Sequence, residues 1–373
     1  MKNHNVTRPQ FAAAIFAALL SPLLRVLPRT ATELAGKASW LSVIPALPAL
    51  LLLMALMNAL RRQTMPGEGM ADVILRFFGP VFGRILLILF FFWFIFYAGF
   101  ILRSGAVRLT ATVYQQSGPD PFIIVMLILC LIASLGTMRA TARTAVLLRA
   151  ILLIALGFVS LFAISNISRK NLFPIAVDEL PGVALGALPI LTVGGVAGLF
   201  SFLNAYIEPT DQPTKWTLPP MILYSLAASA VCLTVVGTFG AALTTKLSYP
   251  FFTMIRDVTL FNLNQRIEAV VIALWVFADF ILCTMLLRCA HEALRTVFRL
   301  PKPEDTAYFS LRNGRWLLLL EAPAAYGCSH LISASSDRFF LWSQTLVPLI
   351  SNIFVFGGFS LIWLVGKLRG KIQ

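Results

Sequence analysis

Charged side chains are scarce in this chain. They make up 12% of its 373 residues, whereas a soluble globular domain carries roughly 25%. Hydrophobic residues make up 58%, and the mean hydropathy is +0.84. This composition excludes a soluble globular protein and predicts a polytopic membrane protein. The net charge of +14 comes from basic residues scattered singly between apolar runs, so we attribute it to membrane topology rather than to a nucleic-acid partner.

Motifs for catalysis and for metal binding are missing. The sequence contains neither a G-x-S-x-G turn nor a G-x-x-x-x-G-K-[ST] loop, and His4, His291 and His330 lie far apart near the polar edges of apolar runs. We therefore predict that the protein is not an enzyme and has no cofactor or metal. The cysteines lack CxxC or Cys/His spacing and are interpreted as packing or lipid-facing residues: Cys130, Cys232, Cys283, Cys289 and Cys328.

Ten runs are long and apolar enough to cross a bilayer, which takes about 20 residues each. No soluble domain can be separated between them, so we expect a single all-α transmembrane domain over 1–373. The first run lacks the cleavage site of a signal peptide and is interpreted as the first span. The expected spans are 9–28, 39–60, 82–112, 121–138, 145–167, 183–207, 217–243, 264–290, 315–333 and 341–367.

An even number of spans places both ends of the chain on the same side of the membrane. If that side is the cytoplasm, nineteen of the thirty basic residues fall in cytoplasmic segments. Basic residues favour cytoplasmic loops. We therefore expect both termini in the cytoplasm, although Arg25, Arg29 and Lys37 fall on the opposite side.

Two spans contain helix-breaking residues in their middle. LLSPLLRVLP places Ser21 and Pro22 inside the first span, and PILTVGGVAGLFSFLNAYIEP places Gly194, Gly195 and Gly198 inside the sixth. Breaks at corresponding positions of two halves are typical of an inverted-repeat transporter whose ligand site lies where the helices unwind. The alternative is that these residues only kink the helices or let them pack closely.

The two predicted halves are 9–167 and 183–367. Unwinding frees backbone N–H and C=O groups, which a bilayer cannot satisfy, so a break needs a cavity or a ligand beside it. Helix N-termini favour a carboxylate, and free carbonyls favour an ammonium group or a cation. An amino acid carries both groups and would fit such a site.

Charged residues inside the spans are few. Asp279 lies in span eight and Glu321 in span nine, while Arg103 and Arg108 lie near the outer end of span three. A carboxylate inside a bilayer is costly and is therefore a functional candidate. We expect Asp279, Glu321 and Arg103 to act in coupling or gating, with Asp279 as a proton carrier or as the partner of Arg103. An interhelical hydrogen bond, or a position nearer the interface, is the alternative.

Short motifs follow one another along almost the whole chain. They begin with the start of span one, continue through the junction that opens span two, and end in span eight with Trp275. Their residues are Gln10, Phe11, Leu27, Pro28, Ala35, Gly36, Trp40, Leu41, Gly79, Gly83, Arg103, Arg139, Arg143, NLFPI at 171–175, Tyr249, Pro250, Arg266, Glu268 and Trp275. In order and spacing, this set resembles the spore-germination permeases, the B subunits of GerA-type germinant receptors.

The resemblance implies an APC-superfamily, LeuT-like fold of five plus five inverted repeats. It also implies a place in the spore inner membrane, beside a germinant receptor A subunit and a lipoprotein C subunit. The ligand pocket would lie between broken spans one and six, with spans three and eight as its walls. Carried onto this sequence, the pocket residues are Ser21, Pro22, Leu23, Leu24, Tyr97, Gly194, Gly195, Gly198, Ser201, Asn204 and Trp275.

The chain departs from the family pattern at two places. Relatives commonly break span one at glycines, whereas Ser21 and Pro22 stand here, so one backbone donor is missing. Relatives often carry an acidic residue after the glycine of span six, whereas Val196 follows Gly195. The ligand would then be less polar than is usual in the family, or this copy would bind a different germinant.

The leading hypothesis is a germinant-receptor subunit that binds a small nutrient, an amino acid, and signals to its partners. The rival is a secondary transporter that couples amino-acid movement to protons or sodium through Asp279 or Glu321. A third hypothesis is a scaffold with a vestigial pocket. Span eight offers only Thr284 as a late hydroxyl ligand, which favours protons over sodium.

Overall fold

The computed structural model is helical throughout the part of the chain that it describes. The one exception among its regular elements is a parallel bridge between Val6 and Ile207. The described residues are 6–65, 67–112, 114, 116–208, 214–257, 264–300, 314, 316–332, 339 and 342–369, without the side chains of 112, 214–216, 257, 264–271, 273 and 274. The prediction of an all-α membrane protein is confirmed.

Helices occupy each of the ten ranges that were predicted to span the membrane; the number of crossings itself stays a prediction. The regular elements are α1 (Arg8–Ala35), η1 (Gly36–Ser42), α2 (Val43–Arg61), α3 (Met70–Phe78), α4 (Phe82–Thr112), α5 (Asp120–Leu135), α6 (Met138–Ala163), η2 (Ile164–Asn166), α7 (Arg169–Leu172), η3 (Val177–Glu179), α8 (Leu180–Leu185), α9 (Ala187–Leu199), η4 (Phe200–Tyr206), α10 (Thr214–Thr244), α11 (Pro250–Asp257), α12 (Asn264–Val297), α13 (Leu317–Leu331), η6 (Trp342–Leu346), α15 (Val347–Asn352), η7 (Ile353–Gly358) and α16 (Phe359–Leu368).

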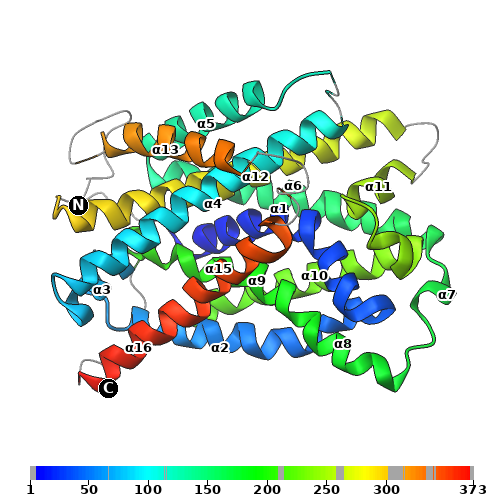
Figure 1. Cartoon of the computed structure of the whole chain (residues 1–373), viewed down its shortest axis with the longest axis horizontal. Helices are drawn as coiled ribbons and strands as arrows, with labels where there is room; N and C mark the ends of the chain where they lie inside the picture. Colours follow the sequence, from blue (N-terminus) through cyan, green and yellow to red (C-terminus); the bar gives the residue numbers. More distant parts are fainter. Residues whose placement is uncertain are drawn as a thin grey trace.

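Most helices run along the long axis of the molecule, with α1 near the middle (Figure 1). α1 packs against α6, α9, α10 and α12, while α4 lies along α12 and is covered by α13. Every side chain of α1 from Phe11 to Arg25 is buried. The middle of α1 therefore lies inside the bundle, beside α12.

The start of α1 is fixed by a capping interaction. The backbone N–H of Thr7, the N-cap residue, donates a hydrogen bond to Oε1 of Gln10 at 3.2 Å. This satisfies a backbone group that the first helical turn leaves free. Just before it, Val6 donates its N–H to the carbonyl of Tyr206 at 2.8 Å and accepts the N–H of Glu208 at 3.1 Å. The start of α1 is thus tied to the end of η4.

The predicted unwinding of span one at Ser21 and Pro22 is wrong. Every residue from Arg8 to Ala35 is helical. Figure 1 shows instead that the first and second halves of α1, in darker and lighter blue, run in different directions. A proline removes one N–H and its ring pushes on the preceding turn, which bends a helix without unwinding it. Pro22 and Pro28 both lie inside α1 and account for its bend.

Span six is irregular, but after its glycines rather than at them. Gly194, Gly195 and Gly198 lie inside the α-helix α9, and the chain then tightens at Phe200 into the seven-residue 3-10 helix η4. Runs of 3-10 helix beyond three or four residues are uncommon. The expectation that the glycines themselves mark an unwound segment is therefore wrong.

Two glycines of the family motifs end helices in a left-handed backbone conformation. Gly36 follows α1 with φ 55° and donates its N–H to the carbonyl of Thr32. Gly79 follows α3 with φ 81° and donates its N–H to the carbonyl of Leu75. Residues with a Cβ are strained at such φ values. These two motif positions are thus explained by the backbone.

The outer faces of the helices carry large apolar side chains. Leu52, Phe92, Ile154 and Leu226 are each at least 62% exposed. Apolar surface of this extent is unfavourable in water and suits contact with lipid. In the described residues, six helical stretches are long and apolar enough to cross a bilayer: Arg8–Arg61, Phe82–Ala111, Met138–Asn166, Val177–Tyr206, Thr217–Thr244 and Trp342–Leu368.

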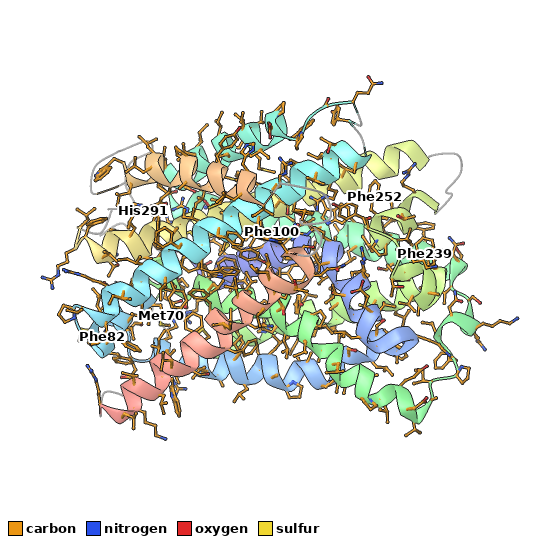
Figure 2. All side chains as sticks on the ribbon, in the orientation of Figure 1. Met70, Phe82, Phe100, Phe239, Phe252 and His291 are labelled. Carbon is orange, nitrogen blue, oxygen red and sulfur yellow. The ribbon has the colours of Figure 1, made fainter. Side chains whose placement is uncertain are left out.

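The two short helices between spans are covered by protein. Met70, Val73 and Ile74 of α3 are fully buried, and Phe252 of α11 is nearly so; Met70 and Phe252 are labelled in Figure 2. α3 packs on α4, and α11 packs on α1 and α10. Their apolar faces belong to the core of the protein.

Candidate functional site

A buried carboxylate joins three helices at the centre of the bundle. The hydroxyl of Ser21 on α1 donates a hydrogen bond to Oδ1 of Asp279 on α12. Arg108 on α4 donates from Nη2 to Oδ2 of the same carboxylate. All three side chains are buried, and Asp279 is 2% exposed. We call Ser21, Asp279 and Arg108 the central junction.

The local sequence of α4 and α12 makes room for the ion pair. Gly105 lies one turn before Arg108, and a Cβ at this glycine would come within 3.0 Å of Oδ2 of Asp279. Trp275 lies one turn before Asp279, and its ring centroid is 4.4 Å from Cζ of Arg108. An arginine over an aromatic ring gains a cation–π interaction, which helps to offset the cost of burying its charge.

A second arginine lies one turn further along α1. Arg25 donates from Nη1 to Oγ of Ser104 on α4, and its Cζ lies 5.1 Å from the centroid of Phe100. It is 5% exposed. Its Nε has no hydrogen-bond partner in the described part of the chain. Asp279 acts on Arg25 electrostatically but is already bonded to Ser21 and Arg108.

Arg25 faces a cavity with an empty volume of about 360 Å³. Its walls come from α1, α4, the bend before α11, Phe339 and η6. The polar part of the wall includes Ser104, Ser248 and Tyr249, and the Tyr249 hydroxyl has no partner among the described residues. Arg29 lies at the same cavity and pairs with Glu33 at 2.9 Å. We call this space the Arg25 cavity.

Other predicted pocket residues lie on the apolar side of the central junction. Leu24 and Trp275 line a second cavity of about 300 Å³, which is walled by leucines of α1 and α6 and by Phe251. Tyr97 stacks on Trp93 with 5.5 Å between ring centroids and on Phe100 with 6.2 Å. Pro22 and Leu23 are buried within α1. Six predicted residues thus lie on the three helices of the junction: Ser21, Pro22, Leu23, Leu24, Tyr97 and Trp275.

The glycines of α9 lie elsewhere and serve helix packing. A Cβ on Gly194 would lie 2.8 Å from side-chain atoms of Leu50 and Tyr224. A Cβ on Gly195 would lie 3.1 Å from Val355, and one on Gly198 would lie 3.4 Å from a methionine of α2. Small residues let helices approach closely in membrane proteins. This is the packing alternative that the sequence left open.

The two remaining predicted residues of span six lie on η4. Ser201 is buried, and its hydroxyl has no hydrogen-bond partner in the described residues. The carbonyl of Asn204 accepts the N–H of Ile207. η4 packs against α12 and α3, and neither Ser201 nor Asn204 lines the Arg25 cavity.

The predicted pairing of Asp279 with Arg103 is wrong. Arg103 points instead to Asp120 at the start of α5, with 3.4 Å between Nη1 and Oδ1. Asp120 is half exposed and also lies 3.7 Å from Nε2 of His330. Arg108, five residues further along α4, takes the place beside Asp279.

Glu321 belongs to a separate polar cluster on α12 and α13. Its Oε1 lies 3.4 Å from Nδ1 of His291, and both side chains are buried. On α12, the next residue, Glu292, accepts hydrogen bonds from the Tyr206 hydroxyl at 2.6 Å and from Nη2 of Arg295 at 2.7 Å. Figure 2 shows His291 towards the left end of the molecule, away from the central Phe100.

Sequence reasoning missed several residues of the site. It named Arg108 without a role, treated Tyr249 only as a motif residue, and left Ser104 out. One pattern in the sequence could have indicated Arg108. It follows Gly105 by three residues on α4, and Asp279 follows Trp275 by four residues on α12, so each charged residue shares a helix face with a residue that borders the ion pair. Nothing in the sequence signals Ser104.

Metal-binding groups are absent from the described residues: no set of three or more His, Cys, Asp or Glu side chains could hold an ion there. The five cysteines have free thiols. His4 and the side chains of the motif residues Arg266 and Glu268 lie outside the described part of the chain.

Solved transporters share this architecture. A substrate-bound, outward-open Na+-coupled sialic acid symporter superposes with a TM-score of 0.64 at 12% identity, over 95% of this chain and 78% of the symporter. A mutant of the manganese transporter of Eremococcus coleocola superposes with a TM-score of 0.56 at 14% identity, over 92% of this chain and 75% of that one. At such identities the likeness concerns the fold alone.

The chain therefore has the fold of the LeuT-like transporters. Residues 5–312 match the family described as spore germination protein. The chain belongs to that family. A search of curated proteins found no match to the sequence. The expected family and the LeuT-like fold are confirmed, while the inverted repeat stays a prediction.

Proposed function

We propose that the chain is the B-type subunit of a germinant receptor in the spore inner membrane. It binds a small nutrient, an amino acid, and signals to an A subunit and a lipoprotein C subunit. Family membership supports the germination role. The observation that carries the proposal is a cavity whose wall includes the buried Arg25 of α1, one turn from the central junction.

The ligand pocket of this proposal differs from the one expected from sequence. It lies between α1, α4 and the bend before α11, rather than at the glycines of α9. The central junction holds α1, α4 and α12 in one arrangement. A ligand that contacts α1 and α4 in the Arg25 cavity can favour another arrangement only by binding it more tightly. Signalling would follow from that shift.

The central junction also favours a receptor over a sodium-coupled transporter. A sodium ion between α1 and α12 would need uncommitted oxygen ligands. Asp279 already has the guanidinium of Arg108 as its counter-charge and the Ser21 hydroxyl as a donor. The negative charge of Asp279, which a coupled sodium ion would neutralise, is thus already neutralised by Arg108.

A proton-coupled amino-acid transporter is the second candidate, and Glu321 favours it. This carboxyl is 1% exposed, and neither of its oxygens has a hydrogen bond in the described residues. The imidazole of His291 lies 3.4 Å away, and the Glu292–Arg295 pair lies on the same stretch of α12. A buried carboxyl with so few partners can bind and release a proton at moderate cost.

Two assays on the same chain separate receptor from transporter. Spores that lack the gene should lose germination in response to at least one amino acid. Proteoliposomes that contain the purified chain should show no concentrative uptake of labelled amino acids. Robust uptake, together with normal germination of the spores that lack the gene, would contradict the receptor proposal.

Glu321→Gln tests the proton-coupled candidate. Glutamine keeps the shape of the side chain but carries no charge, so we expect the folded protein to be as stable as the wild type or more stable by up to about 1 kcal/mol. The nutrient dose-response of germination should be unchanged. Asp178→Asn, at an exposed carboxylate before α8, is the control. Proton-driven uptake that disappears in Glu321→Gln but not in Asp178→Asn would favour the transporter.

A further inference from the structure

We propose that Arg25 is the anion anchor of the Arg25 cavity and that the ligand is a small carboxylate with an apolar body. The inference rests on the proposed function, because it names the chemical group by which this pocket recognises its nutrient. It goes further in assigning the recognition to one side chain of α1 and to one group of the ligand.

The balance of buried charge is the first argument. Arg25, Arg108 and Asp279 form a cluster with two positive charges and one negative charge. Arg108 and Asp279 neutralise each other in an ion pair. In the described part of the chain, the Arg25 guanidinium contacts a neutral hydroxyl, that of Ser104, and the ring of Phe100, while Asp279 acts on it without a direct bond. A buried guanidinium without a counter-ion is costly inside a membrane protein, so an anion that enters this cavity is strongly favoured.

The geometry of the donors is the second argument. Nε of Arg25 is buried without a partner, and the hydroxyl of Tyr249 on the same cavity wall is also unpartnered in the described residues. The arginine fork binds a carboxylate through two parallel hydrogen bonds, which a single hydroxyl such as Ser104 cannot replace. Both donors belong to residues of the cavity wall, and an anion held beside them would give each of them an acceptor.

The rest of the cavity wall limits the ligand. The empty space of the cavity, about 360 Å³, includes solvent at its mouth. Val26 and Phe339 give it apolar wall. Its acidic neighbour Glu33 is paired with Arg29 at 2.9 Å. No described carboxylate is therefore left over for a ligand ammonium group, so the carboxylate of the ligand should matter more than its amine.

The test measures binding by thermal unfolding of the full chain in nanodiscs. Each of the twenty L-amino acids is added in turn, and the one that raises the unfolding temperature most is compared with its carboxamide and with its analogue without the amine. We expect the amide to bind at least about 100-fold more weakly, because it cannot form the charge-assisted hydrogen bonds that the carboxylate forms with an arginine. The analogue without the amine should bind within about tenfold of the amino acid.

Variants tie that difference to Arg25. In Arg25→Gln the acid should lose its advantage over the amide, and Arg25→Lys, which keeps the charge without the fork, should retain part of it. Arg143→Gln, an exposed arginine of α6, is the matched control and should leave the ratio unchanged. If Arg25→Gln does not fold, the comparison of the acid with its amide on the wild-type chain still tests whether the pocket prefers a carboxylate.

The outcomes separate this inference from the proposed function. An amide that binds the wild type as well as its acid overturns the anchor, while nutrient binding stands. A full acid preference that survives in Arg25→Gln also overturns it. Two results together overturn both proposals: the wild-type chain binds no amino acid, and spores that lack the chain germinate normally.

Discussion

Asp279→Ala is expected to cost about 3–5 kcal/mol of folding free energy, because it leaves the buried guanidinium of Arg108 without its counter-charge. The Ser21 hydroxyl loses its acceptor in the same change. The effect should appear as a large fall in the unfolding temperature of the detergent-solubilised protein and in the amount of protein in the membrane. Asp178→Ala, an exposed aspartate before α8, is the control and should change neither.

A double-mutant cycle shows whether the pair, rather than either residue, is responsible. Arg108→Ala should be about as destabilising as Asp279→Ala, because each leaves one buried charge. The double variant should be clearly more stable than the sum of the two losses predicts, because neither the Arg108 guanidinium nor the Asp279 carboxylate then remains buried without its partner. Additive losses would show that Arg108 and Asp279 do not interact in the folded protein.

Gly99→Ala is expected to destabilise the contact between α4 and α13 by about 1–3 kcal/mol, the usual cost of overpacking. An added Cβ would lie 2.6 Å from the carbonyl oxygen of Ala325 and 3.0 Å from the backbone N of Ser329. These are backbone atoms, so a side-chain rotation cannot relieve the clash. The measurement is again the unfolding temperature in detergent.

Gly327→Ala is the matched control on the partner helix. A Cβ there meets nothing within 4 Å, and alanine is the better helix former by roughly 0.5–1 kcal/mol. We expect Gly327→Ala to be neutral or stabilising. If both alanine variants unfold at the wild-type temperature, α4 and α13 are not in backbone contact in the membrane.

The helical fold and the spans were predictable because hydropathy reports the length of an apolar run directly. The glycine and proline positions were harder. Pro22 and Gly194 both predict disruption, yet one bends a helix and the other accommodates Leu50 and Tyr224. A sequence alone does not state whether the room made by a small residue is filled by a ligand or by a neighbouring helix.

The partner of Asp279 was not predictable for a related reason. Arg103 and Arg108 are both arginines near the same end of span three, and they differ by about 140° around the helix. Only the rotation of α4 against α12 decides which one meets the carboxylate. The role of Arg25 depends in the same way on two distant residues, Ser104 of α4 and Tyr249 in the bend before α11. Nothing in the sequence indicates that these residues lie beside Arg25 in the folded protein.

The backbone hydrogen bonds of Val6 with residues 206 and 208 fix the start of α1, and this point can act as the pivot of the helix. Those hydrogen bonds hold the start of α1 at a fixed distance from η4, so the helix can swing more easily at its far end than at its start. Arg25 stands about 28 Å of helix away from Val6. On such an arm, a tilt of about 5° carries its guanidinium by about 2 Å. A small rotation of α1 about its start would therefore be felt at the cavity as a change in the position of Arg25.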